Sequence, residues 1–349
     1  MRKENILIDN IEILKGPHQL SFDITNKCNF RCLHCYNSSG ENIVVDNELT
    51  DQEVINFIKE IAEMKLLNVC FCGGEPLIRR ELIYECAKLL IEAKTSHVSL
   101  VTNGYLMTED IAYQLKKNGI DRIQISIDGA SPNTHDRLRN KNGAFNRAIN
   151  AIKILKDTGI SNVNVSFCPT AFNINEFDEV HNLLNKLDIQ ELRVQPLMLL
   201  GRANQHLNEI MPTQLQYRQL VKYIHDINLK GKKPIVEWGD PIDHLIRFRT
   251  IAMDCVNYVS IRANGDIVAS PYLPLVVGNI RKHRFSEYWK AGLAKLWQKE
   301  LPRKMAQNVL SIMDMNNVKE DVPTVWLEND IFVDFIDEMS KEREAYSLS

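Results

Sequence analysis

Hydrophobic residues along the chain fall into short runs that alternate with amphipathic stretches. Runs rich in apolar and β-branched residues predict six strands, at 18–25, 67–72, 97–102, 122–127, 162–168 and 191–197. Amphipathic stretches predict helices at 51–64, 80–94, 108–118, 144–158, 175–187 and 213–229, one after each strand. Several of the runs, such as VSLVT and IQISI, suit strands buried on both faces. The pattern therefore predicts six βα units, with a parallel sheet inside and helices outside.

Six such units are fewer than the eight of a closed barrel. We therefore expect an α/β fold in the form of a partial (β/α)6 TIM-type barrel, with a flat doubly wound sheet as the alternative. In both folds, ligands gather where the parallel strands end at their carboxyl side.

The pattern changes after Lys230. Asn264-Gly265 stands between two short apolar runs and predicts a β-hairpin, and residues 285–296 predict a helix with an aromatic face. These elements indicate a small C-terminal α+β module. Residues 314–349 hold ten acids and three bases, which predicts a solvated, partly helical tail, with an acidic docking segment as the alternative. The expected organisation is an N-terminal extension at 1–17, the barrel at 18–230, the module at 231–313 and the tail at 314–349.

Composition narrows the class of protein. The chain has 349 residues, of which 44% are hydrophobic and 25% charged, as in ordinary globular proteins. Its net charge of −3 gives no electrostatic case for a nucleic-acid partner. No apolar run is long enough to span a membrane, and the N-terminus does not resemble a secretory signal. We expect a cytoplasmic protein without a membrane partner, in which eight cysteines serve metal binding or catalysis rather than disulfides.

Three cysteines form a CxxxCxxC array directly after the first predicted strand: Cys28, Cys32 and Cys35. Thiolates at this spacing can converge on one metal centre. Three thiolates leave a tetrahedral zinc site one ligand short. Either His34 completes a structural zinc site, or one metal position stays open for chemistry. The cysteines of the next unit, Cys70, Cys72 and Cys86, are interpreted as small core residues.

The array resembles that of the radical S-adenosylmethionine (SAM) enzymes, in which it follows the first strand of a partial barrel. The resemblance implies that Cys28, Cys32 and Cys35 hold three irons of a single 4Fe–4S cluster and that SAM chelates the fourth iron. Reduction of the cluster then cleaves SAM and releases a 5'-deoxyadenosyl radical, which takes hydrogen from the substrate. The family usually has an aromatic residue before the third cysteine. Here that residue is His34, and Tyr36 is expected to cover the adenine instead.

The segment after the second strand, Cys72-Gly73-Gly74-Glu75-Pro76, is similar to the family's GGEP motif. The resemblance implies that Gly73, Gly74 and Glu75 receive the amino group of SAM, with glycines that let the backbone approach the ligand. On this interpretation, Gly74→Val weakens SAM binding and leaves the iron in place.

Further SAM contacts are implied at the ends of the third and fourth strands and in the segment that follows. The residues are Asn103, Ser126, Asp128 and Arg139, the last as a bidentate partner of the SAM carboxylate. The alternatives are a capping role for Asp128 and a surface ion pair for Arg139.

Residues 254–280 resemble the SPASM or twitch modules of the family's maturase branch, which begin with a cysteine, continue through a hairpin and then read GNI. No cysteine follows Cys255, so we expect a degenerate module without an auxiliary cluster.

The resemblance implies an enzyme that modifies a ribosomally made peptide at an unactivated carbon, by epimerisation, cross-linking or oxidation, with flavodoxin or ferredoxin as reductant. One alternative is a cofactor-biosynthesis enzyme that acts on a small molecule, for haem-type tetrapyrroles or the molybdenum cofactor. The other is a zinc-stabilised binding protein without catalysis. No residue is assigned to acid–base catalysis or to radical quenching.

Overall fold

One continuous sheet of eleven strands organises the protein. The computed structural model describes residues 15–41, 45–239, 256–307 and 330–337. The strand order is β11-β10-β9-β8-β1-β2-β3-β4-β5-β6-β7. The strands are β1 (Gln19–Thr25), β2 (Asn68–Gly73), β3 (His97–Thr102), β4 (Arg122–Ser126), β5 (Asn162–Phe167), β6 (Glu191–Val194), β7 (Ile235–Trp238), β8 (Tyr258–Ile261), β9 (Asp266–Ser270), β10 (Leu273–Asn279) and β11 (Ile331–Phe332).

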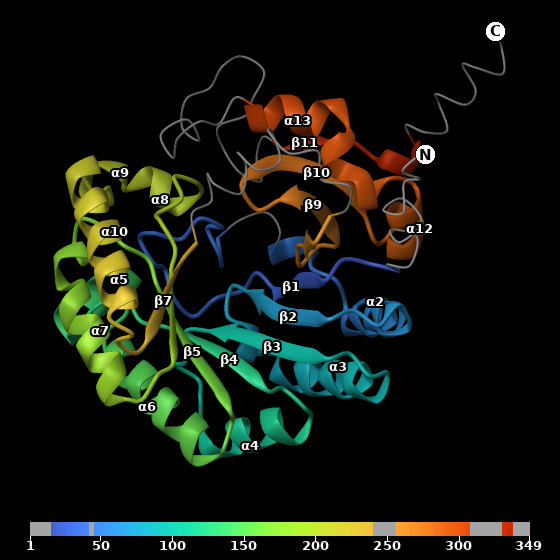
Figure 1. The fold of residues 1–349 in the computed structure, drawn as a ribbon. Helices are drawn as coiled ribbons and strands as arrows, with labels where there is room; N and C mark the ends of the chain where they lie inside the picture. Colours follow the sequence, from blue (N-terminus) through green and yellow to red (C-terminus); the bar gives the residue numbers. More distant parts are fainter. Residues whose placement is uncertain (1–14, 42–44, 240–255, 308–329, 338–349) are drawn as a thin grey trace, which may run out of the picture.

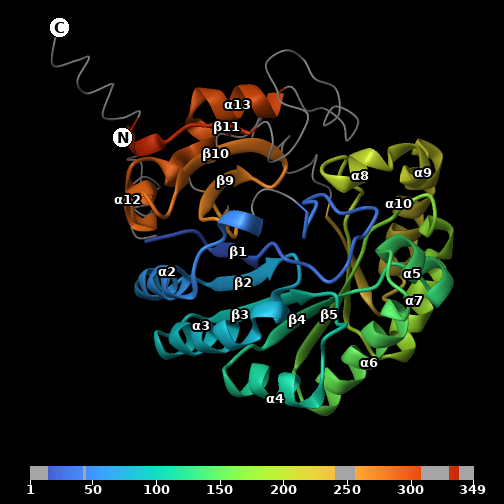
Figure 2. The same ribbon diagram turned by 180° about the vertical axis from the view of Figure 1, so that it is seen from behind.

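Strands β1 to β7 are parallel to their neighbours, and the sheet curls with the helices on its outer side (Figure 1). The same arrangement is seen from behind in Figure 2. The helices of this part are α2 (Asp51–Met64), α3 (Arg80–Glu92), α4 (Glu109–Lys117), α5 (Pro132–Arg139), α6 (Ala144–Asp157), α7 (Phe177–Lys186), α8 (Arg202–Gln205), α9 (Leu207–Ile210) and α10 (Gln214–Leu229), with 3-10 turns at Val45–Asn47, Pro76–Arg79 and Ile174–Glu176. The predicted α/β fold with a partial parallel barrel is confirmed.

The structure differs from the predicted elements in a few places. Strand β6 ends at Val194 rather than at residue 197, because Pro196 has no N–H for the ladder. Strand β7 pairs with β6, so the parallel sheet continues beyond Lys230. The helix predicted at 285–296 is divided at Gly292, whose φ of 125° is not helical.

The C-terminal module consists of β8 to β11, α12 (Phe285–Lys290), a 3-10 turn at Leu293–Gln298 and α13 (Glu300–Gln307). Strand β8 pairs in parallel with β1, and β8, β9 and β10 are antiparallel, with the predicted Asn264-Gly265 turn between β8 and β9. The module shares one hydrophobic core with the barrel. Phe285 of α12, for example, meets Phe57 of α2 edge to face at 6.2 Å.

Residues 330–337 pack against the module, whereas the sequence predicts a solvated tail. Strand β11 pairs with β10, Phe335 is buried, and the carboxylate of Asp330 forms a buried ion pair with Arg262. The remaining tail residues and Cys255 lie outside the described residues.

Within the described ranges, no helix is both long enough and apolar enough to cross a membrane.

Candidate active site

The loop that follows β1, residues 26–41, carries the three cysteines; we call it the cysteine loop. Cys32 is buried, and Cys28 and Cys35 are half-buried. An N–H group points at each sulfur: Phe30 N at 3.4 Å from Cys28 Sγ, Ser39 N at 3.5 Å from Cys35 Sγ and Arg139 Nη1 at 3.9 Å from Cys32 Sγ. Such donors stabilise metal-bound thiolates and tune an iron–sulfur centre.

Without metal, the loop favours protonated thiols. Burial raises the pKa of Cys28 to about 11 and the pKa of Cys32 to about 12. Binding of metal at these sulfurs must therefore release protons, as is general for thiolate ligands.

Two side chains that the sequence did not identify hold the cysteine loop in shape. Arg202, buried at the start of α8, donates to the carbonyl oxygens of Cys32 at 3.1 Å and Ser39 at 3.2 Å. Glu48 accepts hydrogen bonds from Thr25 Oγ1, Asn26 N and Lys27 N, at 2.9, 2.6 and 3.2 Å. Arg202 lies far from the loop in sequence, and Glu48 reaches back more than 20 residues to its partners, so no local motif marks them.

The geometry fits a cluster better than a single zinc ion. Among the described residues, only His283, Asp334 and Asp337 form a group of three whose ligand atoms all lie within 4.8 Å of one another. At least one pair of the three cysteine sulfurs is therefore more than 4.8 Å apart, whereas sulfurs around one tetrahedral zinc lie about 3.8 Å apart. His34, the fourth ligand of the zinc alternative, directs Nε2 to Asp128 Oδ2 at 3.3 Å.

The two glycines of the GGEP-like segment approach the cysteine loop itself. A Cβ on Gly73 would lie 2.1 Å from Thr25 O, and one on Gly74 would lie 2.2 Å from Lys27 O. The backbone also bonds across this contact, from Gly74 N to Thr25 O and from Glu75 N to Lys27 O, both at 2.9 Å. A branched side chain at Gly74 would displace Lys27, the residue before Cys28, so the structure favours loss of iron in Gly74→Val over the retention expected from sequence.

Glu75 is buried and engaged within the protein. Its carboxylate accepts hydrogen bonds from Leu77 N, Thr102 Oγ1 and Asn103 N, at 3.1, 2.6 and 2.9 Å, while burial raises its pKa. Asn103 in turn donates to Asn29 Oδ1 of the cysteine loop at 2.9 Å. These two residues join the ends of β2 and β3 to the cysteine loop.

Asp128 and Arg139 form a buried pair next to Cys32. Arg139 donates to Asp128 Oδ2 through Nε at 2.6 Å, and its Nη2 lies 2.5 Å from the same oxygen. Cys168 N donates to Asp128 Oδ1 at 2.8 Å. Burial acts to raise the pKa of Asp128, but Arg139 holds it below its usual value. The pair is thus neither a surface ion pair nor a simple helix cap.

Ser126 ends β4, and Tyr36 follows Cys35 in the cysteine loop. Ser126 is half-buried and accepts a long hydrogen bond of 3.5 Å from Ser166 Oγ. Tyr36 keeps 37% of its surface exposed. Burial, followed by the nearby Asp23 and Cys72, raises the pKa of Tyr36.

A cavity of about 590 Å³ occupies the barrel interior. Its lining mixes apolar residues, such as Leu100, Val101 and Leu192, with polar ones: Ser21, Cys70, Cys72, Ser99, Gln124, Asn164, Gln195 and Tyr258 are among the latter. The module closes one side through Tyr272, whose hydroxyl accepts a hydrogen bond from Gln195 Nε2 at 2.9 Å. Cys70 and Cys72, interpreted from sequence as core residues, thus face a cavity. The signal that was missed is the alternation of polar residues along β1 and β2.

Asp23 lies beside this cavity wall. It accepts a hydrogen bond from Cys72 Sγ at 3.4 Å, and Ser21 Oγ lies 2.8 Å from the same sulfur. Burial raises the pKa of Asp23 to about 6. An acid–base group with a pKa near neutrality is suited to proton transfer.

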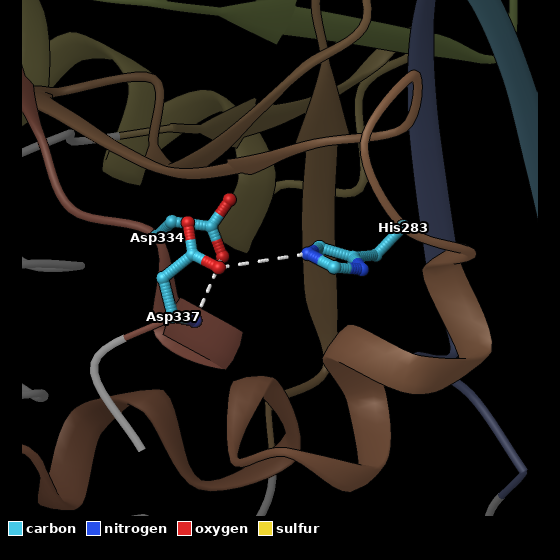
Figure 3. A group of neighbouring side chains, drawn as sticks. All are labelled: His283, Asp334 and Asp337. Atoms are coloured by element: carbon cyan, nitrogen blue, oxygen red, sulfur yellow. Dashed lines mark hydrogen bonds and ion pairs between the residues drawn. The ribbon is translucent and has the colours of Figure 1, made fainter. Parts of the chain in front are cut away.

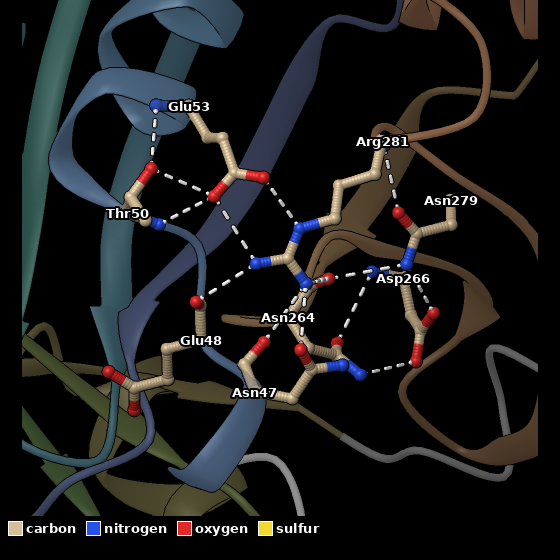
Figure 4. A network of polar contacts seen from close by, with 8 residues as sticks. All are labelled: Asn47, Glu48, Thr50, Glu53, Asn264, Asp266, Asn279 and Arg281. Carbon is tan, nitrogen blue, oxygen red and sulfur yellow. Dashed lines mark hydrogen bonds and ion pairs between the residues drawn. The ribbon is translucent and has the colours of Figure 1, made fainter.

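A polar network connects the module with the start of α2 (Figure 4). Arg281 donates to both carboxylate oxygens of Glu53, at 2.7 and 3.2 Å, and to the backbone oxygens of Asn47 and Glu48, at 3.1 and 3.0 Å. Glu53 also closes the capping box with Thr50. Because Glu48 holds the cysteine loop, the network links the module to that loop.

A second group of potential ligands lies in the module: His283, Asp334 and Asp337 (Figure 3). Lys282 Nζ lies 3.6 Å from Asp334 Oδ2 and 4.0 Å from Asp337 Oδ2. The ammonium group thus already supplies positive charge to these carboxylates, and Tyr288 Oη donates to Asp334 at 2.8 Å. The arrangement is that of a surface ion-pair group.

Comparison with known proteins agrees with this geometry. Residues 22–186 match the sequence model of the Radical SAM superfamily. The chain is 26% identical over 302 residues to the AdoMet-dependent heme synthase of Methanosarcina barkeri, covering 80% of this chain and 84% of that protein. It is 32% identical over 235 residues to the mycofactocin maturase MftC of Mycolicibacterium smegmatis, covering 66% of this chain and 56% of that protein.

The fold is shared with SuiB of Streptococcus suis in its crystal structure with the precursor peptide SuiA. The TM-score is 0.65 at 16% sequence identity, over 81% of this chain and 66% of that chain. At this identity the likeness concerns the fold.

Proposed function

Since the chain is a radical SAM enzyme through its residues 22–186, we propose that it holds one 4Fe–4S cluster on Cys28, Cys32 and Cys35 and modifies a peptide bound in the barrel. The superfamily implies the cluster and SAM as cofactors. When bound and reduced, they supply a 5'-deoxyadenosyl radical that abstracts hydrogen. The observation that carries the proposal is the cysteine loop, in which each of the three sulfurs faces an N–H donor.

The residues at the strand ends divide into two proposed groups. Gly73, Gly74, Glu75 and Asn103 shape the wall that SAM meets. The two glycines pack against Thr25 and Lys27, Glu75 N bonds to Lys27 O, and Asn103 bonds to Asn29. Arg139, held by Asp128, directs its remaining N–H groups toward the sulfur side, where they suit the carboxylate of SAM. Ser126 and Tyr36 are proposed as direct contacts.

The polar lining of the cavity supports a peptide as substrate. Amide and hydroxyl side chains, such as Gln124, Asn164 and Ser99, can pair with peptide groups, which would be costly to bury unpaired. The mycofactocin maturase and SuiB supply the family analogy. The proposed reaction is hydrogen abstraction at an unactivated carbon, and the proposed compartment is the cytoplasm, where cysteines stay reduced.

Cofactor biosynthesis on a tetrapyrrole is the second candidate, because the heme synthase of M. barkeri aligns over 84% of its own length. A macrocycle needs a broad apolar face against its ring. The amide and hydroxyl side chains spread along the cavity, such as Gln124, Asn164 and Ser99, favour the peptide.

Two assays test the proposal. Anaerobically reconstituted protein, reduced with dithionite, should convert SAM to methionine and 5'-deoxyadenosine, and Cys32→Ala should abolish this conversion. Co-expression with short peptides encoded beside its gene should then change the mass of one of them. Modification of an iron tetrapyrrole without any peptide change would favour the second candidate instead.

A further inference from the structure

A cleft of about 690 Å³ lies on the outer surface of the barrel, at α5 and the turn that leads to α6. Tyr105, Arg137 and Lys141 are among the residues that line it. It is separate from the interior cavity, because the two share no lining residue.

The cleft is positively charged. Arg137 is exposed, and its guanidinium stacks over Phe172 at 3.8 Å. Lys141 Nζ and Arg147 Cζ lie 5.1 and 5.6 Å from the ring centre of Tyr105.

Asp136 is the one acid among the lining residues of the cleft. Its carboxylate is engaged by Gly143 N at 2.6 Å and Phe145 N at 2.7 Å, at the start of α6. Two cations, Arg137 and Lys141, therefore line the cleft beside one engaged carboxylate, on a chain whose net charge is −3.

The cleft is also close to the cysteine loop. The ring of Tyr105 meets Phe30 edge to face at 5.4 Å. Phe30 belongs to a small buried cluster in which Cys28, Cys32 and Cys35 also take part. One pair of aromatic rings thus separates the cleft from the thiols.

We propose that this cleft is the docking surface for an acidic one-electron carrier protein of the flavodoxin or ferredoxin class. The inference rests on the proposed function. Electron-transfer partners associate through small, transient interfaces, and complementary charge raises their association rate. In the step itself, the carrier loses one electron and the cluster gains it, while no bond forms or breaks.

Charge reversal tests the proposal by direct binding. The test variant is Arg137→Glu with Lys141→Glu. The matched control is Arg218→Glu with Lys222→Glu, at two exposed positions on α10 that carry the same residue types. Calorimetric titration of the cluster-free full chain with purified flavodoxin at low salt should show binding to the parent. We expect the cleft variant to bind about tenfold more weakly, the control to stay within about twofold, and added salt to weaken binding to the parent.

A second measurement separates docking from chemistry. SAM cleavage driven by reduced flavodoxin should fall about tenfold in the cleft variant, while cleavage driven by dithionite stays at the parent rate. If the parent does not cleave SAM with dithionite either, the proposed function is refuted. The docking proposal is then tested by the binding measurement alone.

Three results would overturn the docking proposal. The first is a parent that does not bind flavodoxin, and the second is a control that loses as much binding as the cleft variant. The third is cleft-dependent binding of a polyglutamate peptide without binding of flavodoxin, which would assign the cleft to an acidic peptide.

Discussion

At the scale of single residues, the contact between Gly74 and the cysteine loop gives the sharpest prediction. A branched side chain at Gly74 must displace Lys27 O, which lies 2.2 Å from the Cβ position. We expect Gly74→Val to lose most of its iron after reconstitution, measured by chemical iron assay. In the control, Gly239→Ala, the added Cβ meets the flexible Arg193 side chain at 3.3 Å, and iron content should match the parent. Normal iron in Gly74→Val with defective SAM binding would restore the interpretation made from sequence.

Asp23 predicts a pH dependence of stability. Its pKa is raised from 3.8 to about 6 by burial, so the folded chain holds a proton that the unfolded chain releases between these values. Ionising the buried carboxylate therefore reduces the free energy of unfolding. This reduction is absent below about pH 4 and complete above about pH 6, where it amounts to roughly 3 kcal/mol.

Asp23→Asn removes this reduction. The cluster-free variant should be about 1–3 kcal/mol more stable than the parent at pH 7.5 and no more stable near pH 4. Urea unfolding at the two pH values measures this difference. An equal difference in stability between variant and parent at both pH values would refute the raised pKa of Asp23.

The sequence reveals only part of the candidate site. The cysteine array and the GGEP-like segment are local patterns, so their spacing alone identifies them. Arg202 and Glu48 reach the cysteine loop only after folding, and their own neighbours in sequence carry no signal. The alternating polar residues of β1 and β2 are visible in the sequence. Because Cys70 and Cys72 were interpreted as core residues, the cavity that they line was not predicted.

At the scale of elements, Arg281 joins the module to the turn before α2. Arg281→Met removes six hydrogen bonds from a partly exposed side chain, so the free energy of unfolding should fall by about 1–2 kcal/mol. Arg284→Met serves as the control, because Arg284 pairs with Glu60 and Glu63 only at 3.5 and 3.7 Å and is 61% exposed. Denaturant unfolding compares the two variants. Equal losses would mean that the network does not hold the module.

Elements with strong local patterns were predicted, and those that depend on tertiary contacts were not. The six βα units and the Asn264-Gly265 hairpin follow from periodicity and turn chemistry. Helix α5 is mostly polar and buries only His135 and Leu138, so its periodicity is weak. Strand β10 contains Pro274, which argues against a strand, and β11 is only two residues long.

At the scale of the whole molecule, the continuous sheet makes the module part of the barrel fold rather than an appendage. Residues 330–337 complete it through the buried ion pair of Arg262 with Asp330. Asp330→Asn leaves the buried guanidinium without its counter-charge and should reduce the free energy of unfolding by about 3 kcal/mol. Asp337→Asn, at a half-exposed carboxylate, should change it by less than about 1 kcal/mol. Thermal unfolding of both variants provides the measurement. If Asp330→Asn is as stable as the parent, residues 330–337 are not anchored by this ion pair.

We propose that Cys28, Cys32 and Cys35 hold a single iron–sulfur cluster. The most direct test is the metal content per chain after anaerobic reconstitution with iron, sulfide and zinc together, combined with electron paramagnetic resonance of the reduced protein. The account predicts about four irons, no stoichiometric zinc and one cluster signal, all lost in the Cys28→Ala, Cys32→Ala, Cys35→Ala triple variant. One zinc per chain without iron would contradict the cluster, and about eight irons would contradict its being the only one.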